Sequence, residues 1–307
     1  MMHKMLTAKA PKALSSVLPE MPTDLREKTE RILDQIQSYG SVVVAFSGGV
    51  DSTLVTYLAK LAVGDRAIAV TADSPSLPSS ELKETKELAK FIGVKHMIVR
   101  TEELEDPNYV SNPANRCYFC KKELSEKLIQ LATDLNVHAI IDGTNAEDLI
   151  GHRPGAAALS ERGVRRPLAD AGMSKVEVRE LARLFGLPNH DKPSMPCLSS
   201  RVQYGQLITP DRLLKIEKSE NAVRSLTGVK ELRVRDHGNL ARIEVGKDER
   251  GLFFDEELLN RIGAALRDFG FTYVTLDVIG YRSGSMNELL STKMRSGKEI
   301  ETRPRTH

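Results

Sequence analysis

The sequence predicts an α/β fold in which a parallel-sheet domain is followed by a smaller α+β domain. Three observations lead to this fold. Short apolar runs rich in β-branched residues alternate with helical segments, a glycine-rich turn joins the first such run to a helix, and the pattern changes from Thr209 onward. We expect a flexible tail, the parallel-sheet domain, the α+β domain and a second flexible tail at residues 1–22, 23–203, 204–290 and 291–307.

The elements of the first domain are expected to alternate along the chain. We place its strands at residues 41–46, 66–71, 95–100, 139–142 and 164–168. We place its helices at residues 23–37, 54–61, 79–92, 118–135 and 174–185. Segments 101–116 and 153–163 are expected loops, the second lying over the site, and 186–205 is the expected hinge. The alternation implies right-handed crossovers, a parallel sheet and a ligand site at the carboxyl ends of its strands.

The second domain has a different pattern. Its helices are expected at residues 210–226 and 255–269, and its strands at residues 231–235, 240–245 and 273–279. The first two strands are separated by Asp236-His237-Gly238-Asn239, which predicts a hairpin. We therefore expect helices beside a small, mostly antiparallel sheet.

The overall composition argues against several classes of protein. Among 307 residues, 44 basic and 42 acidic side chains give a formal net charge of +2, so no global basic field favours nucleic acid as a partner. No apolar run approaches the length that spans a membrane, and residues 1–22 lack the apolar core of a signal peptide. We therefore expect a cytoplasmic protein without a membrane partner. The three cysteines, an odd number, argue against a disulfide framework.

The glycine-rich turn is the strongest sign of function. Ser47-Gly48-Gly49-Val50-Asp51-Ser52 follows a predicted strand and leads into a helix. The glycines let the backbone approach a phosphate, the first-turn N–H groups and the helix dipole favour its charge, and Ser47 and Ser52 add hydroxyl groups. The Lys-Ser/Thr pair of a Walker A loop is missing. Asp51 inside such a cradle makes sense only if a divalent cation also binds there.

Further candidate binding residues follow two other predicted strands. Asp73 lies just after the second strand, and Asp142-Gly143-Thr144-Asn145 ends the fourth. Because the carboxyl ends of parallel strands meet at one edge of a sheet, we expect these residues to converge with Ser47 on one site.

The cysteines are candidate metal ligands. Cys117 and Cys120 lie three residues apart at the start of an expected helix, where exposed amides and Lys121 would lower the pKa of both thiols. A lone C-x-x-C is ambiguous between a redox dithiol, a zinc site and iron–sulfur ligation. Zinc normally takes four ligands, and a thioredoxin-type motif would follow a strand directly. Three thiolates suit a 4Fe-4S cluster with one open iron, which requires Cys197 to fold back onto the pair.

These motifs together resemble a known family. SGGVDS resembles the PP-loop signature of the ATP pyrophosphatases, which split ATP into an adenylylated substrate and pyrophosphate. With RCYFCK, DGTN, PCLSSR and RVRDHGNLARIE, it resembles the LarE-type ATP-dependent sulfur transferases of nickel-pincer cofactor biosynthesis. The resemblance implies an adenine nucleotide alpha hydrolase-like PP-loop domain, ATP and Mg²⁺ as cofactors, and a pyridinium dicarboxylate mononucleotide as the substrate that is adenylylated and then receives sulfur.

The resemblance also implies roles for individual residues. In the three-cysteine subtype Cys117, Cys120 and Cys197 would hold a 4Fe-4S cluster that carries sulfide, whereas in the other subtype a single cysteine at the position of Cys197 gives up its own sulfur. The expected catalytic residues are Cys197, Arg235 and Asp51. The residues expected to bind the cofactor are Ser47, Gly48, Gly49, Asp51, Ser52, Asp73, Gly143, Thr144 and Arg201.

An anionic substrate also calls for cationic receptors. The candidates are Arg201, Arg233, Arg235, His237 and Arg242. Arg235 is favoured by its place at the end of the hairpin strand, and Arg233 and Arg235 share a face of that strand. Arg116 is a candidate for orienting the AMP or cluster side. Glu217 and Glu220 are candidates for holding a metal or positioning an arginine.

Three other functions stay open at this point. A tRNA thiolase would need a basic RNA-binding face or an added RNA module, which the near-neutral charge disfavours. An ammonia-using PP-loop synthetase would need no cluster. A non-catalytic ATP-binding regulator is disfavoured by Asp51. For the sulfur transferase we expect a sulfide donor as a partner and a homo-oligomeric state.

Overall fold

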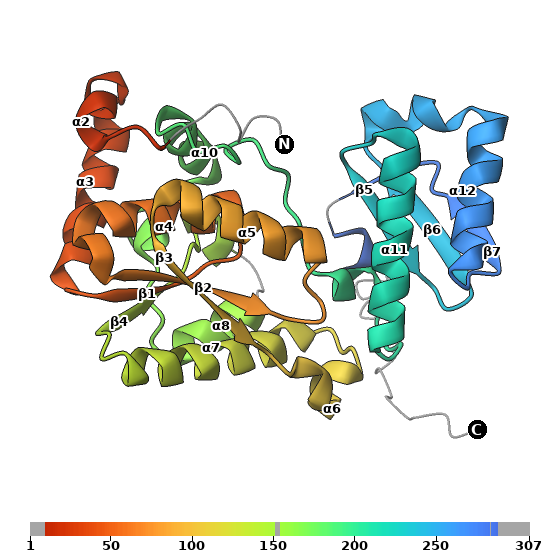
Figure 1. The fold of residues 1–307 in the computed structure, drawn as a ribbon, viewed down its shortest axis with the longest axis horizontal. Coiled ribbons are helices and arrows are strands. Elements are labelled where there is room, and N and C mark those ends of the chain that lie inside the picture. Colours follow the sequence, from red (N-terminus) through yellow and green to blue (C-terminus); the bar gives the residue numbers. More distant parts are fainter. Residues whose placement is uncertain (1–9, 151–153, 283, 288–307) are drawn as a thin grey trace. The chain divides into compact units, whose positions relative to one another are not determined.

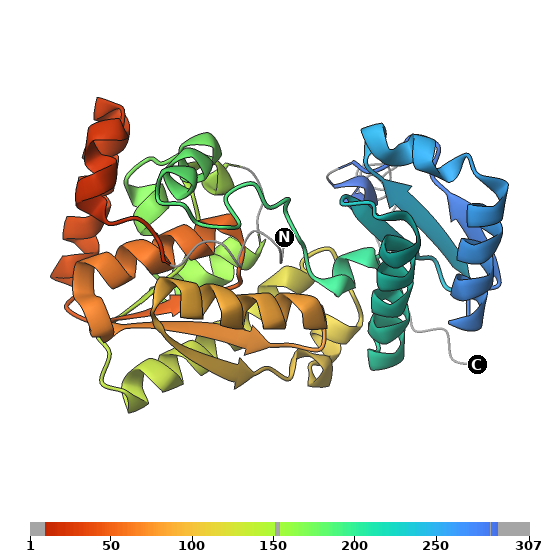
Figure 2. The same ribbon diagram turned by 45° about the horizontal axis from the view of Figure 1, so that its top comes forward.

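The computed structural model describes residues 10–150, 154–282 and 284–287, and the chain divides into two compact units (Figures 1 and 2). Unit 1 comprises Met1–Glu103 and Cys117–Met195, and unit 2 comprises Leu104–Arg116 and Pro196–His307. The division therefore falls earlier in the chain than the expected boundary at 203/204. In addition, Leu104–Arg116 belongs to unit 2, although the sequence places it within the first domain.

The sheet of unit 1 is parallel, as predicted. Its strands are β1 (Val42–Ala45), β2 (Ala67–Asp73), β3 (Lys95–Arg100) and β4 (Ala139–Ile141), in the order β3-β2-β1-β4. Residues 42–45 of β1 pair with 67–70 of β2, and residues 42–44 pair with 139–141 of β4. The chain thus moves from β1 to opposite sides of the sheet, which creates a switch point between β1 and β4. In open parallel sheets this is where ligands bind.

Helices cover both faces of this sheet (Figure 1). One face carries α3 (Thr23–Ser38), α4 (Val50–Val63), α5 (Ser79–Ile92) and α10 (Lys175–Leu184), and the other carries α7 (Arg116–Asp134) and α8 (Pro154–Glu161). Because β1 is buried on both sides, it is apolar at every position. Val42 and Val44 pack into the first core with Leu54 of α4, and Val43 packs into the second with Leu128 of α7.

Two predicted helix ends are confirmed. α5 stops at Gly93, which has the left-handed backbone (φ 71°) of a helix C-cap. α10 begins after Ser174, whose side chain accepts from the backbone N–H of Glu177 while the Glu177 carboxylate accepts from the backbone of Ser174. This reciprocal capping box fixes the start of α10.

Four local predictions for unit 1 and its neighbouring segments are wrong. Residues 154–161 of the expected 153–163 loop form α8, because the alanine-rich stretch favours helix; Arg153 lies outside the described residues. The expected strand 164–168 is reduced to a single bridge between Arg165 and Ile141, and α9 (Pro167–Asp170) begins at a proline. The expected loop 101–116 contains η3 (Glu103–Glu105) and α6 (Pro107–Val110).

The fourth concerns the expected N-terminal tail. Residues 10–22 are not a loose segment: they contain α2 (Leu14–Val17) and η1 (Leu18–Glu20), and Val17 is fully buried. The hydroxyl of Tyr57 donates to the carbonyl oxygen of Lys12 at 2.7 Å. The remaining short elements of unit 1 are η2 (Gly64–Arg66) and η4 (Ala146–Leu149).

Unit 2 is an α+β arrangement. It contains α11 (Pro210–Thr227), α12 (Glu256–Asp268), β5 (Leu232–Asp236), β6 (Leu240–Val245), β7 (Tyr273–Leu276), η5 (Leu198–Arg201), η6 (Lys247–Phe253) and η7 (Ser285–Asn287). β5 and β6 form the predicted antiparallel hairpin, but β7 pairs parallel to β6, so the sheet is mixed. The parallel pairing follows from the crossover through α12, which returns the chain in the direction of β6.

The part of the chain that the structure describes contains no helix long and apolar enough to cross a membrane. The expected flexible tail at 291–307 lies outside the described residues.

Candidate functional site

The turn between β1 and α4 forms a compact cradle. The backbone N–H of Ser47 donates to Oγ of Ser52 at 3.3 Å, and the two hydroxyl oxygens lie 3.1 Å apart. The Ser52 hydroxyl also donates to the carbonyl oxygen of Gly49 at 3.0 Å. Gly48 has a φ of 74°, a conformation that favours glycine. The turn therefore closes on itself at the start of a helix of 14 residues, the arrangement that binds anions.

Gly143, directly after Asp142, brings the end of β4 against this cradle. A Cβ atom at Gly143 would lie 2.6 Å from the backbone nitrogen of Ser52 and 2.8 Å from the carbonyl carbon of Asp51. The approach is therefore one of backbone against backbone. The segments after β1 and β4 converge as the sequence predicts, while Asp73 is exposed at the end of the neighbouring strand β2.

Asp51 has two polar partners in the described residues. Its Oδ1 accepts from Nδ2 of Asn145 at 3.1 Å, and its Oδ2 forms an ion pair with the ammonium of Lys175 at the first position of α10. The Asp51 side chain keeps 21% of its surface exposed and that of Lys175 33%. A cation thus already lies against this carboxylate, which shows that the position suits positive charge. Oxygen ligands of this kind suit Mg²⁺, so the residues present fit the metal.

Asp142, in the same loop as Gly143, is buried. One carboxylate oxygen accepts from the backbone N–H of Thr144 at 2.8 Å, and the other has no hydrogen-bond partner among the described residues. Burial raises the pKa of Asp142, an effect that the amide of Thr144 and the charges of Lys121 and Arg166 only partly offset.

The two thiols of the C-x-x-C lie in the first turn of α7. Residues three apart on a helix share a face, so Cys117 and Cys120 are neighbours on its surface. Cys117 is exposed and Cys120 partly so, and Gly155 of α8 lies against Cys117. Cys197 belongs to unit 2. Within the described ranges no group of three or more His, Cys, Asp or Glu side chains is placed to hold a metal ion.

Arg201 fixes the backbone around Cys197 inside unit 2. Its side chain is fully buried; Nε lies 2.8 Å from Oε1 of Glu220 and Nη2 lies 3.2 Å from Oε2. Its Nη1 donates to the carbonyl oxygen of Cys197 at 3.0 Å. Of the two predicted roles of Glu220, positioning an arginine is the one that these contacts bear out. Arg201 was expected to bind the cofactor, and in this arrangement its guanidinium faces Glu220 and the loop backbone.

Arg235 supports the same loop. It donates to Oε2 of Glu244 at 3.0 and 2.7 Å and to the carbonyl oxygen of Ser200 at 3.2 Å, and only 5% of its side chain is exposed. Arg233 shares its strand face, as predicted, and is 1% exposed. Burial and the nearby Arg201 lower the pKa of Arg233 from 12.5 to about 10. These arginines are buried and hydrogen-bonded within unit 2, whereas we expected them to be receptors for an anionic substrate.

Of the other cationic candidates, Arg242 and His237 are more accessible and Arg116 is not. Arg242 keeps 29% of its side chain exposed and pairs with Glu244 and Asp277. His237 is half-buried, and Nδ1 lies 2.9 Å from Oε1 of Gln203. Burial and the charge of Arg242 lower the pKa of His237. Arg116 is buried; it donates to Oδ1 of Asn112 at 2.6 Å and lies over the ring of Tyr204.

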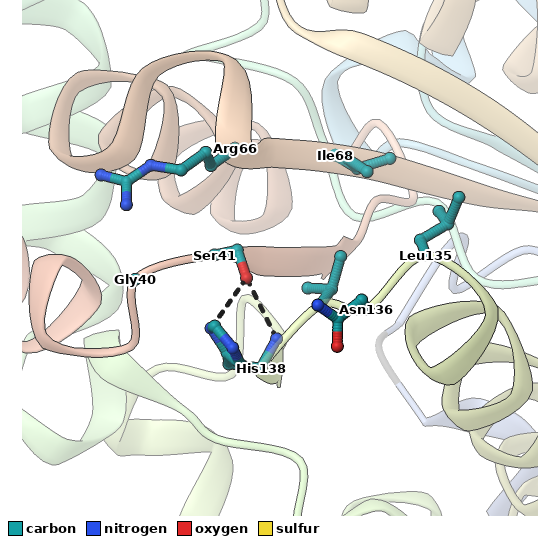
Figure 3. Close-up of a pocket in the computed structure, with 8 residues that line it drawn as sticks. Gly40, Ser41, Arg66, Ile68, Leu135, Asn136 and His138 are labelled. Atoms are coloured by element: carbon teal, nitrogen blue, oxygen red, sulfur yellow. Dashed lines mark hydrogen bonds between the residues drawn. The ribbon is translucent and has the colours of Figure 1, made fainter.

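A separate concavity of about 330 Å³ lies at the opposite, amino-terminal edge of the unit 1 sheet (Figure 3). Its polar lining residues are Ser41, Arg66, Asn136 and His138, and Oγ of Ser41 and Nδ1 of His138 lie 3.2 Å apart. Ile68, Leu135 and Val137 supply an apolar wall. Because ligands of parallel sheets bind at the carboxyl edge, the cradle is the stronger candidate for the nucleotide site.

Two residues that contact the cradle were not predicted from the sequence. Lys175 lies at the start of α10, and Asn189, which donates to the cradle backbone, lies in the segment interpreted as a hinge. A lysine at the first position of a helix is unfavourable with respect to the helix dipole. This unusual placement could have indicated that Lys175 pairs with an acidic side chain elsewhere. Asn189 has no local pattern that distinguishes it from a turn residue.

Comparisons with known proteins agree with this geometry. A family model described as asparagine synthase matches residues 24–114. The chain is 45% identical to the uncharacterized protein slr1717 of Synechocystis sp., covering 87% of this chain and 99% of that protein. It is 35% identical to the pyridinium-3,5-bisthiocarboxylic acid mononucleotide synthase of Lactiplantibacillus plantarum, covering 87% of this chain and 96% of that enzyme.

A more distant similarity covers about two thirds of the chain. One subunit of the glutamine-hydrolyzing GMP synthase of Archaeoglobus fulgidus is 29% identical over 65% of this chain and 67% of its own length. The chain therefore belongs to the family of the L. plantarum synthase, the LarE family, and is an ATP-dependent enzyme built on a PP-loop domain.

Proposed function

We propose that this enzyme uses ATP to adenylylate the carboxylates of a pyridinium dicarboxylate mononucleotide and then replaces carboxylate oxygen with sulfur. The product would be the thiocarboxylate precursor of the nickel-pincer cofactor. The observation that carries the proposal is the 35% identity to the L. plantarum synthase over 96% of its length. The cradle that follows β1 supports it, because adenylylation requires a site for pyrophosphate.

Adenylylation gives the carboxylate a good leaving group. A carboxylate oxygen leaves poorly, whereas AMP leaves readily from an acyl-adenylate. The amides at the start of α4 and the hydroxyls of Ser47 and Ser52 are suited to hold the pyrophosphate. Asp51 would hold Mg²⁺, which supplies charge neutralisation for the phosphates. Because Gly143 has no side chain, the segment after β4 can lie directly against the first turn of α4 and form one wall of the site.

For the sulfur step we propose the three-cysteine version of the reaction. Cys117 and Cys120 share a helical face and, with Cys197, would hold a 4Fe-4S cluster. Such a cluster supplies sulfide in deprotonated form near neutral pH. Arg201 and Arg235 hold the backbone of Cys197 and Ser200, so we assign them the positioning of the Cys197 thiol.

The test is the iron and acid-labile sulfide content of anaerobically prepared protein, compared with Cys197→Ala. We expect about four irons per chain, lost in Cys197→Ala. Ser200→Ala, three residues further on, is the matched control and should keep its iron. Pyrophosphate release with the dicarboxylate nucleotide is measured on the same samples.

Two other outcomes would change the proposal. Iron-free protein whose Cys197 loses the mass of H₂S after turnover would replace the cluster by the sacrificial mechanism. Iron-free protein with unchanged cysteines would remove both mechanisms and favour an ammonia-using synthetase, to which the likeness to the A. fulgidus GMP synthase gives some support. A sulfide donor, a homo-oligomeric state and a cytoplasmic location stay predictions.

A further inference from the structure

The segment that leads to Cys197 is anchored on the phosphate cradle. Nδ2 of Asn189 donates to the carbonyl oxygen of Gly48 at 3.0 Å and to the hydroxyl of Thr53 at 2.9 Å. Asn189 is fully buried, as is Thr53. One side chain therefore bridges the glycine turn and the first turn of α4, the two parts of the cradle that would close around a phosphate.

The chain around Asn189 forms a compact turn, residues 187–192, which we call the anchored turn. The backbone N–H of Lys192 donates to the carbonyl oxygen of Asn189 at 3.0 Å. Arg179 of α10 donates to the carbonyl oxygens of His190 and Lys192 at 3.0 and 2.8 Å. The anchored turn is thus tied to α10 at its far end as well as to the cradle.

Lys192 adds a second anchor on α5. Its side chain, 5% exposed, lies 2.7 Å from Oε2 of Glu81 and 2.9 Å from Oε2 of Glu84. The same helix contacts the cradle: a Cβ at Gly48 would lie 2.8 Å from the methyl group of Thr85. Gly48 is therefore held between α5 and Asn189, and any displacement of Gly48 acts on both.

Cys197 follows the anchored turn by five residues, and the segment between them contains two prolines, Pro193 and Pro196. Proline fixes φ and restricts the residue before it, so a short segment with two prolines absorbs little displacement. A shift of the anchored turn is therefore transmitted along the chain toward Cys197.

We propose that Asn189 is a positioning residue through which the ligand state of the phosphate cradle controls the backbone leading to Cys197. Pyrophosphate bound to the cradle fixes Gly48 and Thr53, which strengthens their bonds to Asn189 and orders residues 187–197. The cradle and the sulfur-transfer segment then respond together within one turnover. This inference rests on the ATP-dependent activity and is independent of the sulfur source.

The experiment is hydrogen–deuterium exchange of the whole protein, with and without Mg²⁺ and inorganic pyrophosphate, read by peptide mass spectrometry. In the wild type we expect slower exchange in residues 47–53 and also in residues 187–197, by about fivefold, the effect of roughly one net hydrogen bond. In Asn189→Ala we expect protection of residues 47–53 without protection of residues 187–197.

A milder pair of variants guards against misfolding of Asn189→Ala. Thr53→Val removes one acceptor of Asn189, whereas Thr56→Val removes an equally buried hydroxyl that bonds to the carbonyl oxygen of Ser52 and not to Asn189. We expect Thr53→Val to reduce the pyrophosphate response of residues 187–197 and Thr56→Val to keep it.

The outcomes separate this inference from the nucleotide site itself. Wild-type protein that shows no protection of residues 47–53 would contradict the pyrophosphate cradle. Protection of residues 47–53 with unchanged exchange of 187–197, or an equal response in Thr53→Val and Thr56→Val, would overturn the role of Asn189 and leave the cradle intact.

Discussion

The ammonium of Lys175 pairs with the carboxylate of Asp51, although the two residues lie 124 positions apart in the chain. The pair joins the first turn of α10 to the first turn of α4. Both helix starts carry partial positive charge, so the lysine is placed against its local electrostatic preference and is held there by the acid.

Lys175→Met should tighten the binding of Mn²⁺ added without nucleotide. The ammonium competes with a divalent cation for Asp51, and its removal should increase Mn²⁺ affinity a few-fold to about tenfold, as expected for a partly exposed pair. Electron paramagnetic resonance of free Mn²⁺ measures this. Lys28→Met is the matched control, because Lys28 pairs with Glu177 at the start of the same helix and not with Asp51. Equal Mn²⁺ affinity in Lys175→Met and wild type would contradict the prediction.

Gly143→Ala should disrupt the cradle. The added methyl group would lie 2.6 Å from the backbone nitrogen of Ser52, so β4 or α4 must move. We expect a loss of about 1–3 kcal/mol in the free energy of unfolding and a marked loss of ATP-dependent pyrophosphate release. Gly263→Ala, where nothing lies within 4 Å of the added atom, should be neutral or stabilising. Urea denaturation compares the two, and unchanged activity in Gly143→Ala would show that the close approach is dispensable.

Breaking the buried pair of Arg201 and Glu220 should be costly. Glu220→Gln leaves the Arg201 charge without its carboxylate, for which we expect a loss of about 3–5 kcal/mol in the free energy of unfolding. The double variant Arg201→Met, Glu220→Leu should lose less than the sum of the losses of Arg201→Met and Glu220→Leu measured separately. A double-mutant cycle by chemical denaturation measures the coupling, and additive losses would argue against a direct interaction.

The same pair predicts an acid-dependent stability. Burial alone would raise the pKa of Glu220, but Arg201, with help from Arg224, holds it below its usual value. The stabilisation is therefore complete above the unfolded pKa of about 4.3 and is lost as pH falls through the lower folded value. Thermal unfolding between pH 3 and pH 7 should show a larger loss of stability in the wild type than in Glu220→Gln, which keeps the contribution of other carboxylates such as Glu177. An identical pH profile for both would contradict it.

Asp142→Asn should act in the opposite direction. Because burial raises the pKa of Asp142, the folded protein binds its proton more tightly than the unfolded chain does, so this group reduces stability as pH rises above about 4. Asparagine keeps an acceptor for the amide of Thr144 and removes the charge. We expect Asp142→Asn to be more stable than wild type at pH 7 and similar at pH 3, as measured by thermal unfolding. Lower stability at pH 7 would indicate that the charge is compensated.

The sequence predicted the fold correctly where a segment has a clear strand composition or a helix-capping residue. Residues 95–100 form β3 as expected, and Ser174 and Gly93 cap helices as expected. The prediction failed for residues 164–168, where the local signal was weak. The segment contains Arg165, Arg166 and Pro167, and the proline suits the first turn of a helix, so the structure has one bridge at Arg165 followed by α9.

The candidate site also has parts that the sequence predicted and parts that it did not. The glycine turn and the segment after β4 are visible because each is contiguous and ends a predicted strand. Asn189 reaches Gly48 over 141 positions, and no periodicity records such a contact. Burial is equally invisible: Arg201 and Arg235 look like open cations in the sequence, yet both pair with glutamates inside unit 2.

The assignment of Leu104–Arg116 to unit 2 has a consequence for synthesis on the ribosome. Tyr109 bonds to Ser199 at 2.6 Å, and Asn112 donates to the carbonyl oxygen of Gln203 at 2.9 Å, so this early segment must wait for partners made some ninety residues later. All of unit 1 has been made once the chain reaches Met195, whereas unit 2 also needs a segment that was made before that point. For the same reason, a gene cut at Met195 would yield a first fragment that contains all of unit 1 and a second fragment that lacks the Leu104–Arg116 part of unit 2.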